Sequence, residues 1–362
     1  PLFQRMDLNF FNLGGVATGI GSLPFTDPEK AVAFVFKHFA DIPYWPQMPR
    51  RGSQEHFAHQ FLAPLVETGL LKTNIDTWLF DLSQPDWPDR LTAFYTTCLA
   101  AEAGDPAAIQ RFLPPEPAAS GFYRFIDYLK QADTDKIRFV KGQIAGPLTC
   151  GLELEDQEGR FSYYQEELRD VIVRTLALNA RSQAAVLSQF GSPAIIFVDE
   201  PAISRYGTRY HLAMSKEMIL GDINAICRSV RSKNALVGVH CCQAIDWSIL
   251  FETEMQILSL DAYRFGDSLI SYSAHIGGFT QGGGVIAWGI VPTLDDPFEE
   301  TPETLFERLQ TLVSKLAHQG VDPEILRKQS MITPACGTGL LSVEKTERIY
   351  ELTSQVSYLW RD

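Results

Sequence analysis

Eight short apolar runs, rich in β-branched residues, divide the sequence, and each ends in small, polar or turn-forming residues. Helix-like segments separate most of them. The runs cover residues 16–22, 41–47, 137–147, 194–201, 235–242, 257–263, 285–292 and 330–336. Near-continuous hydrophobic strands are typical of a parallel sheet that is buried on both faces. Eight alternating strand and helix units therefore predict an α/β fold, a (β/α)8 TIM barrel.

The segments between the runs carry the signals of helices. Residues 26–39 and 301–317 each begin with a capping Thr or Asp and a proline. Residues 161–191 have helical periodicity and end at a glycine. One connection, residues 48–137, is far longer than a single helix requires. We therefore predict one barrel domain over residues 1–362, with 48–137 as a helical insertion between the second and third strands. We expect this insertion to cover one end of the barrel, and it is a candidate homodimer surface.

Charge and cysteine usage narrow the possible partners. The net charge of −13 argues against nucleic acid, because binding to a phosphate backbone depends on Lys and Arg. No apolar run approaches the ~20 residues of a membrane helix, and the first thirty residues lack the pattern of a secretory signal. Six irregularly spaced cysteines do not form a disulfide framework. We expect a cytoplasmic protein with reduced thiols and a small-molecule substrate.

The fifth run ends in a pattern that suits a metal. In GVHCC, alternation along a strand places His240 and Cys242 on one face and Cys241 on the other. Active sites of (β/α)8 barrels form at the carboxyl ends of the strands, and Cys336 ends the last strand. Two thiolates and an imidazole suit Zn²⁺, and three protein ligands leave a catalytic position open. Asp261, at the end of the neighbouring strand, is the candidate fourth ligand.

Each of these residues also has an ordinary structural interpretation. A single buried histidine is usually satisfied within the core, and free cysteines often pack as small hydrophobic side chains. Asp261 could equally cap a helix or pair with a basic residue. The metal interpretation is stronger than these because three suitable residues fall at the ends of strands of one barrel.

Two other strand ends suit a zwitterionic ligand. The turn GIGSLP at 19–24 offers consecutive backbone N–H groups and a hydroxyl, which can hold a carboxylate. Asp199 and Glu200 precede a proline, and one of them could accept from an ammonium group. The structural alternatives are a tight glycine turn for the first segment and a solvated strand end for the second.

Together these residues resemble the C-terminal catalytic barrel of cobalamin-independent methionine synthase, in its short "core" form, within the uroporphyrinogen decarboxylase-like superfamily. The resemblance spans residues 16–360. The segments that carry it are IGS at 20–22, GPLT at 146–149, DEPA at 199–202, HCC at 240–242 and CGTGLLSVEKTERI at 336–349.

The resemblance implies a zinc site without a separate catalytic residue. His240, Cys242 and Cys336 would be the zinc ligands. Asp261 stands where the family has a glutamate ligand, which keeps the carboxylate but shortens its reach.

The resemblance also implies a homocysteine pocket. Ile20, Gly21 and Ser22 would hold the amino-acid carboxylate, and Asp199 the ammonium group. Gln47 stands where the family uses a glutamate, so the ammonium site loses one charge. The acceptor would therefore be a small-molecule thiol similar to homocysteine.

The chain departs from the family where the methyl donor would bind. The tryptophan and the Arg-Cys pair of the family's folate site have no counterpart, and residues 289–296, GIVPTLDD, lack its catalytic histidine. Methyl transfer from a folate must protonate a poor amine leaving group, whereas a methyl corrinoid releases Co(I) without a proton. We expect a zinc-dependent thiol methyltransferase, with methylcobalamin or a corrinoid protein as a plausible donor.

Three other functions remain open at this point. The acceptor could be another thiol, such as coenzyme M, which has no amino group for Asp199 to bind. A porphyrinogen decarboxylase would need basic strand ends, and those found here are acidic or neutral. A non-catalytic relative could hold structural zinc and partner a corrinoid protein, because a closed site needs no general acid.

Overall fold

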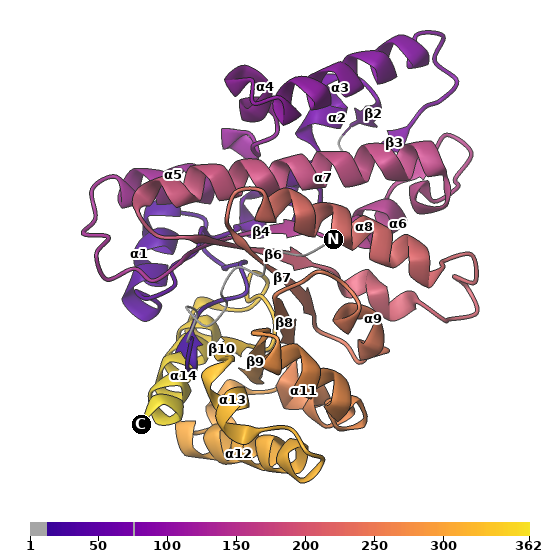
Figure 1. The fold of residues 1–362 in the computed structure, drawn as a ribbon. Coiled ribbons are helices and arrows are strands. Elements are labelled where there is room, and N and C mark those ends of the chain that lie inside the picture. Colours follow the sequence, from indigo (N-terminus) through magenta and orange to yellow (C-terminus); the bar gives the residue numbers. More distant parts are fainter. Residues whose placement is uncertain (1–12, 75–76) are drawn as a thin grey trace.

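The computed structural model describes residues 13–74 and 77–362. Its main sheet has seven parallel strands in the order β1-β10-β9-β8-β7-β6-β4. These strands are β1 (Val16–Ala17), β4 (Val140–Ala145), β6 (Ala194–Asp199), β7 (Leu236–Cys241), β8 (Ile257–Leu260), β9 (Val285–Val291) and β10 (Ser330–Pro334). The sheet is curled and helices surround it, so the fold is α/β and TIM-barrel-like, as the sequence predicts (Figure 1).

The second predicted strand, residues 41–47, forms only isolated bridges, and this part of the prediction is wrong. Tyr44 pairs with Lys141 on one side, and Gln47 pairs with Ser22 on the other. Pro43 and Pro46 lack N–H donors, so a regular ladder cannot run through this segment. The segment nevertheless hydrogen-bonds to both edges of the sheet and completes the ring.

The predicted helices are present with small shifts at their ends. The predicted segments 26–39 and 161–191 contain α1 (Pro28–His38) and α7 (Glu166–Leu187). α12 (Pro302–His318) extends one residue past the predicted 301–317, and Thr301 caps it with a reciprocal capping box. The helices around the ring are α1 (Pro28–His38), α5 (Ser120–Leu129), α6 (Pro147–Glu153), α7 (Glu166–Leu187), α8 (Lys216–Arg231), α9 (Trp247–Phe251), α10 (Ala262–Phe265), α11 (Ser273–Gln281), α12 (Pro302–His318), α13 (Pro323–Lys328) and α14 (Val343–Arg361).

The long connection 48–137 holds more than helices. Besides α5 it contains α2 (Ala63–Glu67), α3 (Trp87–Glu102), α4 (Pro106–Arg111), β2 (Leu71–Thr73) and β3 (Trp78–Phe80). β3 also pairs with β5 (Glu155–Asp156), which follows α6. Helices α2, α3 and α4 pack on α7, beyond the ring (Figure 1). The first part of the connection reaches the strand ends, because Arg50 donates to the carbonyls of Gly339, Leu340 and Leu341.

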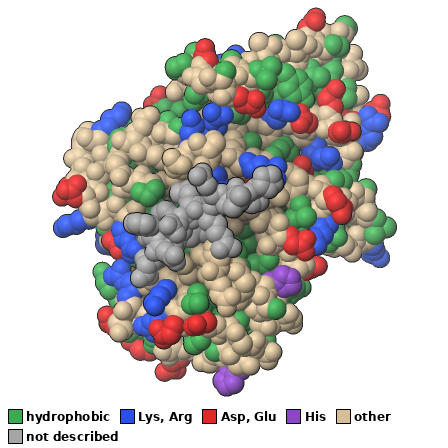
Figure 2. All heavy atoms as spheres, viewed as in Figure 1, with side chains coloured by type: hydrophobic (Ala, Val, Ile, Leu, Met, Phe, Trp, Pro, Cys, Tyr) green, Lys and Arg blue, Asp and Glu red, His purple; other side chains and the backbone are tan. Residues whose placement is uncertain are grey.

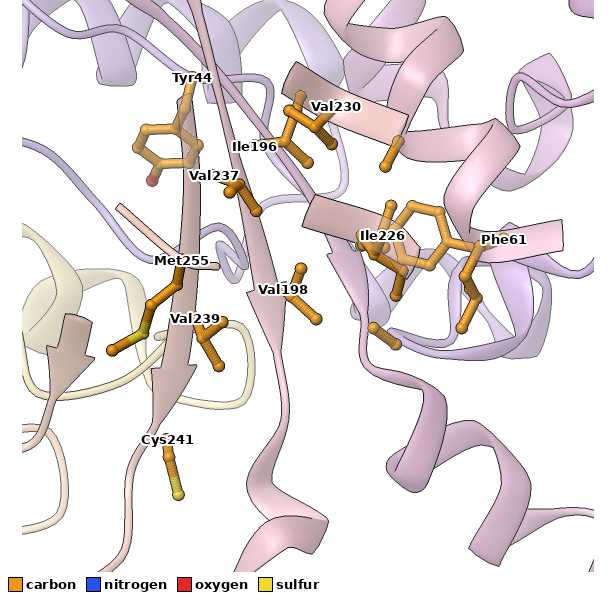
Figure 3. Close-up of a cluster of buried hydrophobic side chains, with 14 of the residues drawn as sticks. Tyr44, Phe61, Ile196, Val198, Ile226, Val230, Val237, Val239, Cys241 and Met255 are labelled. Carbon is orange, nitrogen blue, oxygen red and sulfur yellow. The ribbon is translucent and has the colours of Figure 1, made fainter. Parts of the chain in front are cut away.

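Alternation along the strands separates two hydrophobic layers. Ile195 and Phe197 belong to a small cluster with inward residues of the other strands, whereas Ile196 and Val198 belong to the large core under the helices. Figure 3 shows this outer layer, where the β7 residues Val237, Val239 and Cys241 lie in one cluster with Ile226 and Val230 of α8. Odd and even positions of one strand therefore face different environments.

No helix in residues 13–74 and 77–362 is long and apolar enough to cross a bilayer. Acidic and basic side chains are interspersed on the face seen in Figure 2. The six cysteines are all free thiols.

Candidate metal centre and acceptor pocket

The structure brings His240, Cys242 and Cys336 together. His240 lies near the end of β7, Cys242 directly follows that strand, and Cys336 follows β10. One ligand atom from each lies within 4.8 Å of the other two. Cys241 instead is buried in the outer hydrophobic layer, as the alternation predicts. The three residues therefore offer one nitrogen and two sulfur ligands from the carboxyl ends of two strands.

The orientation of His240 suits a metal ligand. Its Nδ1 lies 2.9 Å from the hydroxyl of Ser259 on β8, which fixes the ring. Its Nε2 is buried and has no hydrogen-bond partner among the described residues. A buried polar nitrogen without a partner costs free energy unless a ligand occupies that position, and ring nitrogens that bind metals are commonly held through the opposite nitrogen in this way. The donor set therefore fits zinc.

The two thiols act on each other's ionisation. The neighbouring thiol of Cys336 lowers the pKa of Cys242, and the nearby imidazole of His240 lowers that pKa further. The hydrogen bond with Cys242 and burial raise the pKa of Cys336 well above its ordinary value. Because one thiolate repels a second, the pair holds both negative charges only when a cation is present.

Asp261 does not join the group of converging ligand atoms. Its Oδ1 accepts from the backbone N–H of Arg264, 2.9 Å away, and so caps α10. The carboxylate is near enough for the charges of Cys242 and His240 to act on its pKa, which burial raises. The prediction of a fourth ligand at this position is therefore not supported, because the carboxylate is used as a helix cap.

The turn at 20–22 is held against the segment that carries Cys336. The backbone N–H of Gly339 donates to Ser22 Oγ at 3.1 Å, and the N–H of Thr338 donates to the Ser22 carbonyl at 3.0 Å. A Cβ on Gly337 would come within 2.3 Å of Ser22 Oγ, so a larger residue there would displace that hydroxyl. Gly21 has a φ of +144°, which favours glycine. These contacts therefore fix the position of the turn relative to the segment that carries Cys336.

Asp199 ends β6 and Glu200 directly follows it, and the carboxylates of these two candidates for the ammonium group point in opposite directions. Asp199 Oδ1 has no hydrogen-bond partner in the part of the chain that the structure describes. Burial raises the pKa of Asp199 to about 6, against the opposing charges of His240 and Lys141. An unpaired carboxylate oxygen close to the candidate ligands suits an ammonium group.

Glu200, the other acid that we considered for the ammonium group, has both carboxylate oxygens engaged in hydrogen bonds. Its two oxygens accept from the backbone N–H groups of Leu148 and Thr149, at 2.9 and 2.8 Å, and from the Thr149 hydroxyl. It is fully buried. The carboxylate therefore binds the first turn of α6, where the helix dipole and free N–H groups favour a negative charge.

Ile20 begins the turn and Gln47 pairs with it at Ser22, and both side chains are buried. Gln47 Nε2 donates to the carbonyl of Phe57 in the insertion at 3.4 Å. The Ile20 side chain belongs to the inner hydrophobic cluster, so it offers a ligand only its backbone. Its carbonyl accepts from the Nζ of Lys141 at 3.3 Å.

Lys141 is a buried residue that sequence reasoning missed. Its ammonium group lies inside the ring, 4.5 Å from the centre of the Phe197 ring and 5.1 Å from that of Tyr44. Burial lowers its pKa to about 8, and the charge of Asp199 opposes that shift. The available signal was a lysine in an otherwise apolar strand, because a charged residue is seldom fully buried without a role.

One solved structure supports the fold. A B12-independent methionine synthase from Shewanella sp. W3-18-1 has a TM-score of 0.55 and 14% identity, covering 96% of this chain and 98% of that chain. An endo-beta-1,4-mannanase from Cellulomonas fimi has a TM-score of 0.36 and 15% identity, over 64% of this chain and 57% of that one. No family model and no curated protein matches the sequence. At 14% identity the first structure is similar in fold alone.

Proposed function

We propose that the chain is a zinc-dependent methyltransferase that moves a methyl group to a thiol, with homocysteine as the acceptor that fits best. The observation that carries this proposal is the convergence of His240, Cys242 and Cys336 within 4.8 Å. The carboxylate of Asp199, whose Oδ1 has no hydrogen-bond partner among the described residues, lies nearby. A metal at the first site would bind the sulfur of an amino-acid thiol, and Asp199 would bind the ammonium group at its other end.

His240, Cys242 and Cys336 would hold the zinc, and zinc bound there would keep the acceptor sulfur deprotonated and nucleophilic at neutral pH. Asp199 would accept from the ammonium group of the acceptor. The turn at Gly21 and Ser22 would hold its carboxylate through backbone N–H groups and the Ser22 hydroxyl, which can still donate.

The Shewanella methionine synthase was solved in complex with selenomethionine. That ligand is an amino acid with a methylated chalcogen, the kind of product our proposal requires. The similarity in fold makes a comparable ligand at the same strand ends a reasonable hypothesis for this chain.

The donor is proposed to be methylcobalamin or a methylated corrinoid protein, although the Shewanella enzyme is B12-independent. A folate donor needs a general acid. Residues 289–296 contain no histidine, and their two acids are already engaged. Asp295 accepts two hydrogen bonds from Arg264, at 2.9 and 3.0 Å, and Asp296 accepts from the N–H of Phe298. Co(I) can leave without receiving a proton.

The test is a methyl-transfer assay with zinc-loaded protein, homocysteine and either methylcobalamin or methyltetrahydrofolate. We expect methionine only with methylcobalamin, and none with a Cys336→Ser variant. Methionine formed only with methyltetrahydrofolate would overturn the proposed donor but support the proposed methyl transfer to homocysteine. No methionine from either donor above the rate without enzyme would overturn the proposed function.

A further inference from the structure

A second group of possible metal ligands lies outside the candidate zinc site. His56, His59 and Glu153 each offer one ligand atom, and the three atoms lie within 4.8 Å of one another. The two histidines belong to the start of the insertion, on either side of Phe57 and Ala58, whereas Glu153 is the last residue of α6. Sequence reasoning did not associate them, because 93 positions separate His59 from Glu153, a distance that no local motif spans.

The two imidazoles are held in place from several sides. The backbone N–H of Ala58 donates to Nδ1 of His56 at 3.4 Å, which leaves Nε2 of that ring as the available ligand atom. The rings of His56 and His59 have centres 4.3 Å apart. The other neighbour of His59 is Trp78, which stacks on it at 4.2 Å with an interplanar angle of 23°. Both side chains are therefore positioned by contacts other than a metal.

The distance between His59 and Glu153 suits two ligands of one metal ion better than a hydrogen bond between them. His59 Nε2 lies 3.9 Å from Glu153 Oε2, which is too far for a hydrogen bond. Two ligand atoms that bind zinc at ~2.1 Å with tetrahedral geometry lie about 3.4 Å apart. A shift of about half an ångström would bring the pair to that separation. Glu153 is at the surface-exposed end of α6 and its side chain can move that far.

We propose that His56, His59 and Glu153 bind a divalent transition-metal ion, separate from the candidate zinc at His240, Cys242 and Cys336. Two imidazoles and one carboxylate are a common ligand set for Zn²⁺ and Fe²⁺, and they leave at least one position for water or an anionic oxygen of a ligand. This inference does not depend on the proposed methyl transfer.

The position of the second site indicates what a metal there would do. Gln47 Nε2 donates to the carbonyl of Phe57, which lies between the two histidines in sequence. The other end of α6 is held by Glu200, which directly follows β6. A metal bound by both segments would therefore link the insertion to the barrel beside the acceptor pocket. Arg205 is near enough for its charge to act on Glu153, so we expect weaker binding than at the thiolate site.

The experiment counts metal ions and identifies their ligands. Wild-type protein and the variants His59→Gln, Glu153→Gln and Cys336→Ser are stripped with a chelator, reloaded with Co²⁺ and analysed for metal content and absorption. Thiolate ligands give an intense near-ultraviolet charge-transfer band with Co²⁺, whereas nitrogen and oxygen ligands do not. His318→Gln, a histidine on the exposed end of α12, is the matched control, and circular dichroism checks that each variant is folded.

We expect two Co²⁺ ions per wild-type chain and per His318→Gln chain. His59→Gln and Glu153→Gln should each lose one ion and keep the charge-transfer band, and Cys336→Ser should lose the band and keep one ion. One ion in wild type, unchanged in His59→Gln and lost in Cys336→Ser, would overturn this inference and leave the proposed function standing. A wild-type chain that binds a single Co²⁺ ion without the charge-transfer band, and loses it only in His59→Gln and Glu153→Gln, would support the second site and overturn the thiolate site. A folded chain that binds no ion would overturn both.

Discussion

The inward and outward sides of the strand ends differ in how completely their polar groups are satisfied. On the inward side, Asp199 Oδ1 and His240 Nε2 are buried without partners among the residues described. On the outward side are their sequence neighbours Glu200 and Cys241. Glu200 accepts three hydrogen bonds, and Cys241 is buried in the outer hydrophobic layer. The inward groups are thus left available to a ligand, while the outward groups hold the helices on the ring.

The largest effect is expected for the two adjacent cysteines, because Cys242 faces inward and Cys241 faces outward. Cys242→Ser should weaken zinc binding by more than the roughly 100-fold that follows loss of a ligand's hydrogen-bond partner, because it removes a soft ligand itself. Cys241→Ser should bind zinc normally but lose about 1 kcal/mol of unfolding free energy, because it places a hydroxyl in the hydrophobic layer while keeping the Gln243 carbonyl, which accepts from the Cys241 thiol, as its acceptor. A competition titration with a zinc indicator and urea denaturation measure the two effects. Equal zinc affinities in the two variants would contradict the comparison.

The next test uses the adjacent acids at the end of β6, Asp199 and Glu200. Asp199→Asn should raise KM for homocysteine roughly 10- to 100-fold, the range for losing a charged hydrogen bond. It should not lower Tm, because the raised pKa of Asp199 shows that burial disfavours its charge. Glu200→Gln should keep KM and lower Tm, because an amide group cannot accept from both the Leu148 and Thr149 N–H groups.

The acceptor used in that assay decides whether Asp199 acts through an ammonium group. With 2-mercaptoethanesulfonate, a thiol that has no amino group, the KM of Asp199→Asn should equal that of wild type. If this thiol is the better substrate of the wild-type protein, the acceptor is not homocysteine. A KM that rises equally for both thiols would mean that Asp199 shapes the pocket rather than binds an amine.

A smaller effect is expected for the residue that orients His240. Ser259→Ala should weaken zinc binding about 10- to 100-fold, because its hydroxyl holds Nδ1 and thereby aims Nε2. Ser330→Ala is the matched control, since it removes a buried strand hydroxyl that bonds to Trp288 and Leu326 instead. If both variants bind zinc equally well, Ser259 is not a positioning residue.

The strand alternation explains both the successes and the errors of sequence reasoning at the site. Applied to GVHCC, it correctly separated Cys241 from His240 and Cys242. The same rule separates Asp199 from Glu200, but the pattern was not applied to VDEP, and the strand end was left with either acid as a partner for the ammonium group. Asp261 shows a different limit: a carboxylate directly before a helix can cap it or bind a metal, and only the backbone geometry distinguishes the two.

Fold prediction succeeded where a pattern was local. Apolar runs identified seven of the strands, and capping residues located α1 and α12. The segment 41–47 was misjudged because two prolines remove ladder donors from an otherwise strand-like sequence. The pairing of His56 and His59 with Glu153 was missed because it depends on how the insertion lies against α6, which no periodicity encodes.

The smallest expected effect is the pH dependence contributed by Glu200. Burial raises its pKa in the folded chain to about 7, against hydrogen bonds from Thr149 and Leu148 that oppose the shift; its ordinary value is 4.5. Below pH 4.5 both the folded and unfolded chains keep the proton. Between pH 4.5 and about 7 the folded chain binds more protons than the unfolded chain, so the free energy of unfolding falls as pH rises. Above that window the contribution is constant.

Glu200→Gln removes this contribution, so its stability deficit relative to wild type should narrow between pH 5 and 8, by on the order of 1 kcal/mol. Urea denaturation of both proteins in the presence of a chelator measures the difference without interference from metal ligands. Glu303→Gln, an exposed carboxylate on α12, reports the general effect of removing one negative charge. A deficit that stays constant with pH would mean that Glu200 is ionised throughout the range. The outward carboxylate would then serve as a permanently charged anchor for α6, and only the inward side of the strand ends would respond to pH.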